Sequence, residues 1–127
     1  MALPVNARIG AAPNFASNLE QAHAFFVQQD AATALARFKQ LKAELREMKR
    51  VLSWSPTSGR PARFLNSQSA QAHMRTAQVV QLAAQVGLPF LREYVVAQHV
   101  VLFAHAESEV VLLALKHHRQ LAYSTIC

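Results

Sequence analysis

The stretch Leu91–Tyr123 reads LREYVVAQHVVLFAHAESEVVLLALKHHRQLAY, and it decides the fold. Its β-branched and aromatic residues fall into three runs, 91–96, 100–104 and 110–115, separated by connections of hairpin length. This pattern predicts three successive antiparallel strands. The third run is too apolar for an exposed strand, so we expect it inside the sheet. It leads into four cationic or ionisable residues that cannot stay unpaired in a core, and a functional site is expected where they emerge: Lys116, His117, His118 and Arg119.

The residues before this stretch predict one strand and a helical hairpin. Pro4–Ile9 alternates apolar and polar side chains, as a short strand does. Ser17 and Glu20 have the spacing of a capping box and predict the start of a first helix. Asp30 is placed as the N-cap of a second helix that is predicted to run to about Val51. The short link at Asp30 makes the two helices antiparallel neighbours.

A third helix is predicted over Ser69–Val86, because Gly87 is placed as a C-cap and Pro89 prevents continuation. Helices followed by a run of strands indicate an α+β fold. We therefore expect a helical hairpin plus a third helix packed on one face of a mainly antiparallel four-stranded sheet, in the order β-α-α-α-β-β-β. The length predicts that residues 1–127 form a single domain.

The second helix carries a narrow apolar seam whose spacing alternates between four and three residues. An amphipathic helix usually buries such a stripe in its own domain, and core packing against the sheet is the expected role. The alternative is that part of the seam receives a helix from another protein. The seam consists of Ala34, Phe38, Leu41, Leu45, Met48 and Leu52.

The segment after the hairpin, Ser53–Pro61, is predicted to be a loop because its proline and glycine residues exclude regular structure. Trp54 is the only tryptophan, and we expect it to anchor the loop to the core. Arg60 and Arg63 flank Pro61 and so lie on a stiff segment. Two arginines held in this way suit phosphate or carboxylate binding, or they are ordinary solvated charges.

The composition restricts the class of protein. A formal net charge of +6 predicts a negatively charged partner, although a merely basic surface would give the same charge. The single cysteine excludes an internal disulfide and suits a reducing cytoplasm. The apolar runs are strand-sized and the first residues do not resemble a secretory signal, so we expect a cytoplasmic protein with no membrane partner.

The histidines do not have the spacing of a metal site. His117 and His118 are adjacent, and successive residues of a regular strand point to opposite faces. On that basis at most one of them faces a shared site, with His118 on the side of Lys116 and His117 on the side of Arg119. No cysteine pair or helical His-x-x-x-His spacing accompanies them. We therefore predict neither a metal nor another cofactor.

Two segments resemble the RelE/ParE toxins of bacterial type II toxin–antitoxin modules. The loop WSPTSGRPARFL is similar to a segment with Pro and Gly-Arg-Pro that is common among ParE members. The end of the chain, REYVVAQHVVLFAHAESEVVLLALKHHRQLAY, resembles the closing pattern YxxLYxxxxxxVxLLxxxHxRxxxY of ParE-like plasmid-stabilisation proteins. The order of a strand, a helical hairpin and a terminal β-meander fits the same family, so the resemblance spans nearly the whole chain.

The resemblance implies a toxin that a cognate antitoxin neutralises. The antitoxin would be ParD-like, with an acidic C-terminal segment that wraps the hairpin and the sheet, and a higher-order toxin–antitoxin complex is possible. The basic surface and the apolar helix faces permit this. The candidate antitoxin-binding residues are Phe25, Phe38, Leu41, Leu45 and Arg60.

The family contains two kinds of activity. ParE-like members stabilise the cleaved complex of DNA gyrase with DNA and are not hydrolases, whereas RelE-like members cleave mRNA in the ribosome. The terminal pattern favours the gyrase interpretation, with Lys116, His117, His118, Arg119 and Tyr123 as the target-binding residues. The alternative endoribonuclease needs cations for the transition state, a histidine for proton transfer and an aromatic ring for stacking. Its candidate residues are Arg60, Arg63, Arg92, His117, His118, Arg119 and Tyr123.

Overall fold

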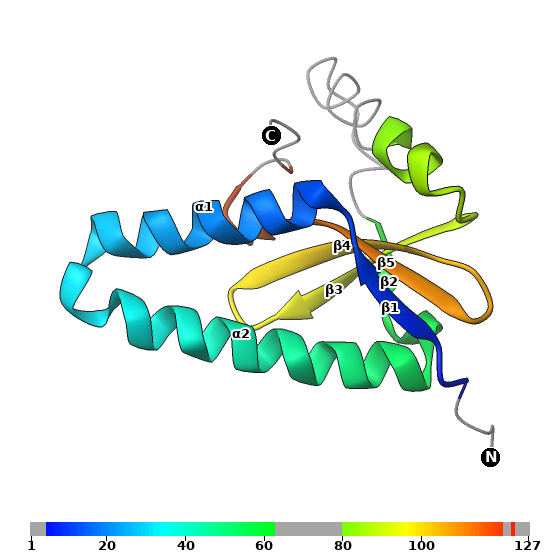
Figure 1. The fold of residues 1–127 in the computed structure, drawn as a ribbon, viewed down its shortest axis with the longest axis horizontal. Coiled ribbons are helices and arrows are strands. Elements are labelled where there is room, and N and C mark those ends of the chain that lie inside the picture. Colours follow the sequence, from blue (N-terminus) through cyan, green and yellow to red (C-terminus); the bar gives the residue numbers. More distant parts are fainter. Residues whose placement is uncertain (1–4, 63–79, 121–122, 124–127) are drawn as a thin grey trace.

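The computed structural model describes residues 5–62, 80–120 and 123 (Figure 1). Within these ranges two long helices are followed by a group of strands, and residues 80–86 are also helical. The elements in chain order are β1 (Arg8–Ala11), α1 (Pro13–Gln29), α2 (Ala31–Trp54), the 3-10 turn η1 (Pro56–Ser58), β2 (Arg60–Pro61), β3 (Phe90–Val96), β4 (His99–His105) and β5 (Glu109–His117). The predicted α+β class with a helical hairpin is confirmed.

The strands form one sheet in the order β1-β5-β4-β3-β2. β1 pairs with β5 in parallel, and the other pairs are antiparallel. The described sheet has five strands instead of the predicted four, because Arg60 and Pro61 pair with Arg92 and Glu93 of β3. The predicted interior position of β5 is confirmed, although β4, with all seven residues buried, is the more buried strand.

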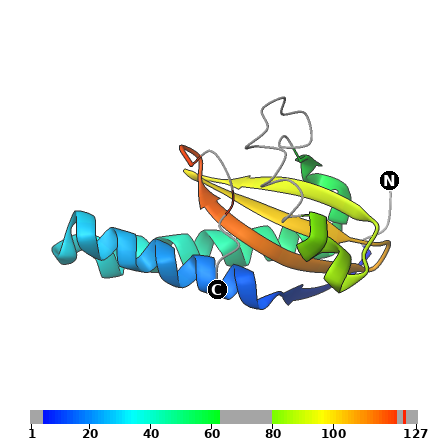
Figure 2. The ribbon, with the colours of Figure 1, turned by 90° about the horizontal axis from the view of Figure 1, so that it is seen from above.

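The two faces of the sheet carry separate apolar clusters. α1 and α2 pack side by side on one face, here called the hairpin face, and their tip extends past the sheet (Figure 2). Val101, Phe103 and Leu112 point to this face. Leu102 and Leu113 point to the opposite face, where they join side chains of residues 80–86. The expectation that all three helices share one face is therefore wrong for the described part of the third helix, and residues 69–79 lie outside the described ranges.

A β-bulge at Leu113 sets the side-chain directions in the second half of β5. Leu102 pairs with Ala114, whereas Phe103 pairs with Leu112, so Leu113 has no partner in β4. Both Leu113 and Ala114 belong to the cluster on the opposite face. A bulge inserts one residue and shifts the alternation of the strand. Leu115 consequently returns to the hairpin face.

Two asparagines of α1 complete the outer edge of β5. β1 covers this edge only as far as the pairing of Ala11 with Leu112. Beyond it, Asn14 Nδ2 donates to the carbonyl of Leu113 at 3.1 Å, and Asn18 Oδ1 accepts the N–H of Leu115 at 3.0 Å. Both asparagines are buried. Since a buried backbone group without a partner is costly, these side chains hold the end of β5 in place against α1.

The helix ends differ in part from the predictions. α1 begins at Pro13, four residues before the predicted cap at Ser17, because Ala12 already bonds to the carbonyl of Leu112 and Pro13 occupies the first helical turn. The predicted cap at Asp30 is confirmed, since its side chain accepts the N–H of Ala32 at 3.0 Å. α2 continues to Trp54, whose side chain is 58% exposed, so the predicted anchoring role of this residue is wrong.

The predicted limits of the first strand also shift. The strand lies at Arg8–Ala11 instead of Pro4–Ile9, and Asn6 has a φ of 56°, which breaks the extended conformation before it.

Gly59, between η1 and β2, has no room for a side chain. A Cβ atom on Gly59 would lie 2.7 Å from the carbonyl oxygen of Glu93 and 2.7 Å from the ring of Phe103. We predict that Gly59→Ala lowers the free energy of unfolding by about 1–3 kcal/mol, because backbone and a core ring must move. The measurement is urea unfolding followed by circular dichroism.

The matched control is Gly10→Ala in β1, where the nearest atom to a new Cβ is Val111 Cγ2 at 4.0 Å. This change should alter the free energy of unfolding by no more than about 0.5 kcal/mol. Equal losses in the two variants would contradict the close packing at Gly59.

Candidate functional site

A cavity of about 570 Å³ lies on the hairpin face, where β4 begins and β5 ends. The C-terminal half of α1 and the start of α2 form its other walls. None of the described residues that line it is an aspartate or a glutamate. They are Asn18, Gln21, Ala22, Phe25, Gln29, Arg37, Gln98, His99, Leu115, Lys116, His117, His118, Arg119 and Gln120. The cavity is therefore cationic and rich in amides.

Three imidazole rings lie together in this cavity. The ring centroids of His99 and His117 are 5.4 Å apart, and those of His117 and His118 are 4.4 Å apart. His99 also meets the ring edge of Phe26 with a centroid distance of 6.0 Å. The expectation that His117 and His118 diverge fails, because β5 ends at His117 and the chain turns there. The alternation of a regular strand no longer applies after that residue.

Hydrogen bonds fix the orientation of two of these rings. His118 Nδ1 lies 2.9 Å from the carbonyl of Gln98, so this nitrogen carries the proton and donates. His117 Nδ1 accepts the backbone N–H of Arg119 at 3.2 Å, so in the neutral ring its Nε2 carries the proton. The backbone N–H of His118 also donates to Gln98 O at 2.7 Å, which ties the end of β5 to the turn before β4.

The environment disfavours the charged form of two histidines. Burial, followed by the nearby His117, lowers the pKa of His99 to about 4, and Glu44 opposes this only in part. Burial also lowers the pKa of His117, and the neighbouring His118 and Arg119 act in the same direction. At neutral pH the His99 ring is therefore uncharged.

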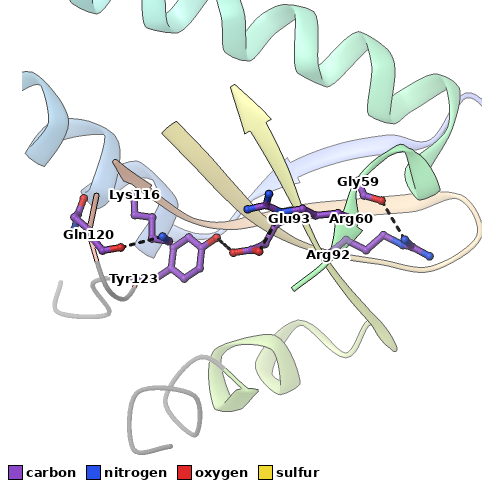
Figure 3. A network of polar contacts seen from close by, with 7 residues as sticks. All are labelled: Gly59, Arg60, Arg92, Glu93, Lys116, Gln120 and Tyr123. Atoms are coloured by element: carbon purple, nitrogen blue, oxygen red, sulfur yellow. Dashed lines mark hydrogen bonds and ion pairs between the residues drawn. The ribbon is translucent and has the colours of Figure 1, made fainter. Parts of the chain in front are cut away.

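A second polar group lies on the opposite face of the sheet (Figure 3). The phenol of Tyr123 donates to Glu93 Oε2, and Arg60 Nε lies 3.5 Å from Glu93 Oε1. Lys116 Nζ lies 5.5 Å from the centre of the Tyr123 ring and donates to the carbonyl of Gln120 at 3.0 Å. Burial, followed by the bond to Glu93, raises the pKa of Tyr123. Tyr123 and Glu93 are both buried, so this ring is not available to stack on a base.

Arg92 belongs to neither group. Its guanidinium donates to His105 Nε2 at 3.1 Å and to the carbonyl of Gly59 at 3.1 Å. His105 stands at the far end of β4 from His99, about 20 Å away at the usual rise per strand residue. Arg92 is thus used to hold the loop before β2 and does not reach the cavity.

The structure brings together only part of the residues named from the sequence. Lys116, His117, His118 and Arg119 all line the cavity, whereas Tyr123, Arg60 and Arg92 are engaged elsewhere. Arg63 lies outside the described residues.

Of the predicted antitoxin-binding residues, only Phe25 lines the cavity, and it is 47% exposed. Phe38 is half-buried and stacks on His23 with a centroid distance of 4.3 Å. Leu41 and Leu45 are buried in the core, so neither offers a surface to a partner in this structure. The expected role of the apolar seam, packing in the core, therefore holds for both residues.

Sequence reasoning missed several residues that matter here. Glu93 gave no signal, because a single carboxylate in a strand is typical of a solvated edge. Asn14 and Asn18 did carry one, since they lie four residues apart and so share a helix face. Arg37 lies outside the apolar seam of the second helix, yet its guanidinium stacks on Phe26 at 4.3 Å and it lines the cavity.

Comparisons add no relative to this description: no model of a known protein family matches the chain, and neither does any curated protein. Among the described residues, no group of three histidine, cysteine, aspartate or glutamate side chains is arranged to hold a metal ion. No helix in the described ranges has both the length and the apolar character that crossing a bilayer requires.

The lowered pKa of His99 predicts a loss of stability in acid. The unfolded chain binds a proton near pH 6.5 and the folded chain only near pH 4, so stability is full above pH 6.5 and falls as the pH drops between these values. His99→Gln should reduce the difference in unfolding free energy between pH 7.5 and 4.5 by about 2–3 kcal/mol. Denaturant unfolding at both pH values measures it.

His23→Gln on α1 is the control, because His23 does not line the cavity. It should leave the pH dependence of unfolding as in the unchanged protein. The same pH dependence in the His99→Gln protein would contradict the assignment to His99.

The bond between Tyr123 and Glu93 predicts a structural role for this tyrosine. Tyr123→Phe leaves a buried carboxylate oxygen without its phenol donor, so the free energy of unfolding should fall by about 1–3 kcal/mol. Tyr94→Phe, on the hairpin face of β3, is the control and should cost less than about 0.5 kcal/mol. If thermal unfolding shows no difference between the two variants, the bond between Tyr123 and Glu93 does not stabilise the fold.

Proposed function

We propose that this chain is the toxin of a type II toxin–antitoxin module of the RelE/ParE kind and that it acts in the cytoplasm. Its order of a strand, a helical hairpin and a terminal meander agrees with this proposal, as does its resemblance to ParE in the segments 54–65 and 92–123. One fold can host many functions, and the cationic residues at the end of β5 are therefore the main support for this proposal.

The single observation that carries the proposal is the placement of His118 and Arg119. Both follow the last residue of β5, both are exposed, and both line a cavity to which no described residue contributes a carboxylate. A target with negative charge is attracted to such a surface. We propose that DNA gyrase in its cleaved complex with DNA is this target, and that the toxin binds it without hydrolysis.

The arrangement supports binding over RNA cleavage. A nuclease needs a proton-transfer group and cations that converge within hydrogen-bond reach of one phosphate. Here Arg92 bonds to His105 and Gly59, and Arg60 pairs with Glu93. Tyr123 is buried, and its phenol donates to the carboxylate of Glu93. The nuclease candidates among the described residues are thus spread over two faces of the sheet.

The cognate antitoxin in this proposal is a ParD-like protein with an acidic C-terminal segment. Phe25 is exposed and lines the cationic cavity. Phe38 belongs to α2, and the Nζ atom of Lys42 lies 4.9 Å from the centre of its ring. An amphipathic acidic segment combines contacts to both kinds of residue. Higher-order complexes of toxin and antitoxin follow if two toxins bind one antitoxin dimer.

The test is a DNA cleavage assay with supercoiled plasmid, gyrase and ATP. We expect the protein to cause linear DNA to accumulate, because it blocks religation. Arg119→Ala should lower this accumulation at least tenfold, since it removes a cation from the rim of the cavity. Arg50→Ala is the matched control, an exposed arginine of α2 that pairs with Glu47 and does not line the cavity.

Two outcomes would overturn the gyrase proposal. One is the absence of linear DNA when the protein is shown by circular dichroism to be folded. The other is a new cut in mRNA on programmed ribosomes, which would assign the protein to the RelE-like endoribonucleases. A loss of poisoning in both arginine variants would show a general charge effect and not a site.

A further inference from the structure

The cavity on the hairpin face has the size and lining of a small-molecule site. Its volume of about 570 Å³ lies within the range of ligand and cofactor pockets, roughly 300–1,000 Å³. A lone phosphate ion fills only a small part of such a space. Its walls belong to four different elements, α1, α2, β4 and β5, which the core holds together. Gln98, His118, Arg119 and Gln120 lie in the turns beside β4 and β5, and the two hydrogen bonds of His118 to the carbonyl of Gln98 tie these turns together.

One part of the cavity is suited to phosphate. Arg37 is held in position, because its guanidinium donates to Gln29 Oε1 at 2.9 Å and stacks on the Phe26 ring. A guanidinium has five N–H donors, so most of them remain for a ligand. Arg119 and His118 lie at the same cavity, and no described carboxylate lines it to compete for them. Arginine is the side chain that binds phosphate in a bidentate manner.

The remaining part is suited to a flat heterocycle. Phe25 is 47% exposed and offers an aromatic surface on which a base can stack. Gln21, Gln98 and Gln120 carry side-chain amides at the cavity. Gln120 Oε1 accepts the N–H of His117 at 2.8 Å and Gln21 Oε1 accepts from Asn18 at 3.4 Å, so these two residues offer mainly their NH₂ donors to a ligand. Such groups match the edges of a nucleobase, which also present donors and acceptors. A ligand that has only an anionic group would leave this part unused.

We propose that the cavity is a binding site for a mononucleotide, with the phosphate at Arg37, His118 and Arg119 and the base at Phe25 and the glutamine amides. This site does not rest on the toxin proposal, because it is argued from the cavity alone and is tested on the isolated protein. A nucleotide bound here covers the end of β5, so it also competes with any partner that uses Arg119.

The histidines connect this binding to protons. His99 is faced by His117, His118, Arg37 and Glu44, and His117 by His118, Arg119, Arg37 and Lys116. Burial and repulsion disfavour the charged forms of His99 and His117 while the cavity lacks an anion. A phosphate bound in the cavity lies near His117 and favours its charged form, so binding takes up protons.

The test is isothermal titration calorimetry of the full chain with adenosine monophosphate, adenosine and inorganic phosphate. We expect adenosine monophosphate to bind at least tenfold more tightly than either of the other two. Repeating the titration at pH 7 in two buffers of different ionisation enthalpy should report net proton uptake. Arg37→Gln and Arg119→Gln should each weaken the binding at least fivefold.

Arg8→Gln, an exposed arginine of β1 outside the cavity, is the matched control and should bind as tightly as the unchanged protein. Imidazole NMR signals of the unchanged protein test the site without any variant, and those of His117 and His118 should shift on addition of adenosine monophosphate. Absence of binding at millimolar concentration overturns the proposal. So does adenosine or phosphate that binds as tightly as the nucleotide, or binding without proton uptake and without a shift of these signals.

Discussion

The β-bulge at Leu113 is the feature on which the placement of the chemistry depends. Without the extra residue, Lys116 would keep the direction of Leu112 and point under the hairpin, and His117 would point to the other side. With it, His117 joins His99 in the cavity, whereas the amine of Lys116 meets Tyr123 on the opposite face. One inserted residue thus places the histidines of the cavity on one face of the sheet and the group of Tyr123, Glu93 and Arg60 on the other.

The bulge in turn needs support from α1. β5 lies inside the sheet, but β1 ends at Ala11, so the backbone groups of β5 beyond Leu112 have no strand on that side. Asn14 and Asn18 replace the missing strand with side-chain amides, four residues apart on one helix face. The same two bonds hold the first half of α1 against the second half of β5, and from Asn18 onward α1 forms a wall of the cavity. The contacts of Asn14 and Asn18 that cover β5 thus also place α1 beside the cavity.

This dependence explains what the sequence could and could not predict. The runs of β-branched residues and the cap at Asp30 are local signals, so the hairpin and the meander could be predicted from them. The bulge is not local, because it depends on how Leu102 and Phe103 of β4 find their partners. The burial of Tyr123 and the exposure of Trp54 are also set by tertiary contacts. The expectation from the sequence assumes a regular strand, in which successive residues point to opposite faces, and so it does not include the bulge. For the same reason it places His117 and His118 apart, although the turn after β5 brings their rings together.

The cavity can gain positive charge, because histidines that are neutral in the free protein line it. Burial and neighbouring groups disfavour the charged forms of His99 and His117, whose ring centroids are 5.4 Å apart. Among the described residues that line the cavity, the permanent charges are those of Arg37, Lys116 and Arg119. Glu44 is too weak an influence to offset the burial of His99. An anion that enters replaces repulsion among the rings by attraction. The group of histidines therefore costs little to the folded state at neutral pH, yet it can add charge when a negatively charged ligand or partner arrives.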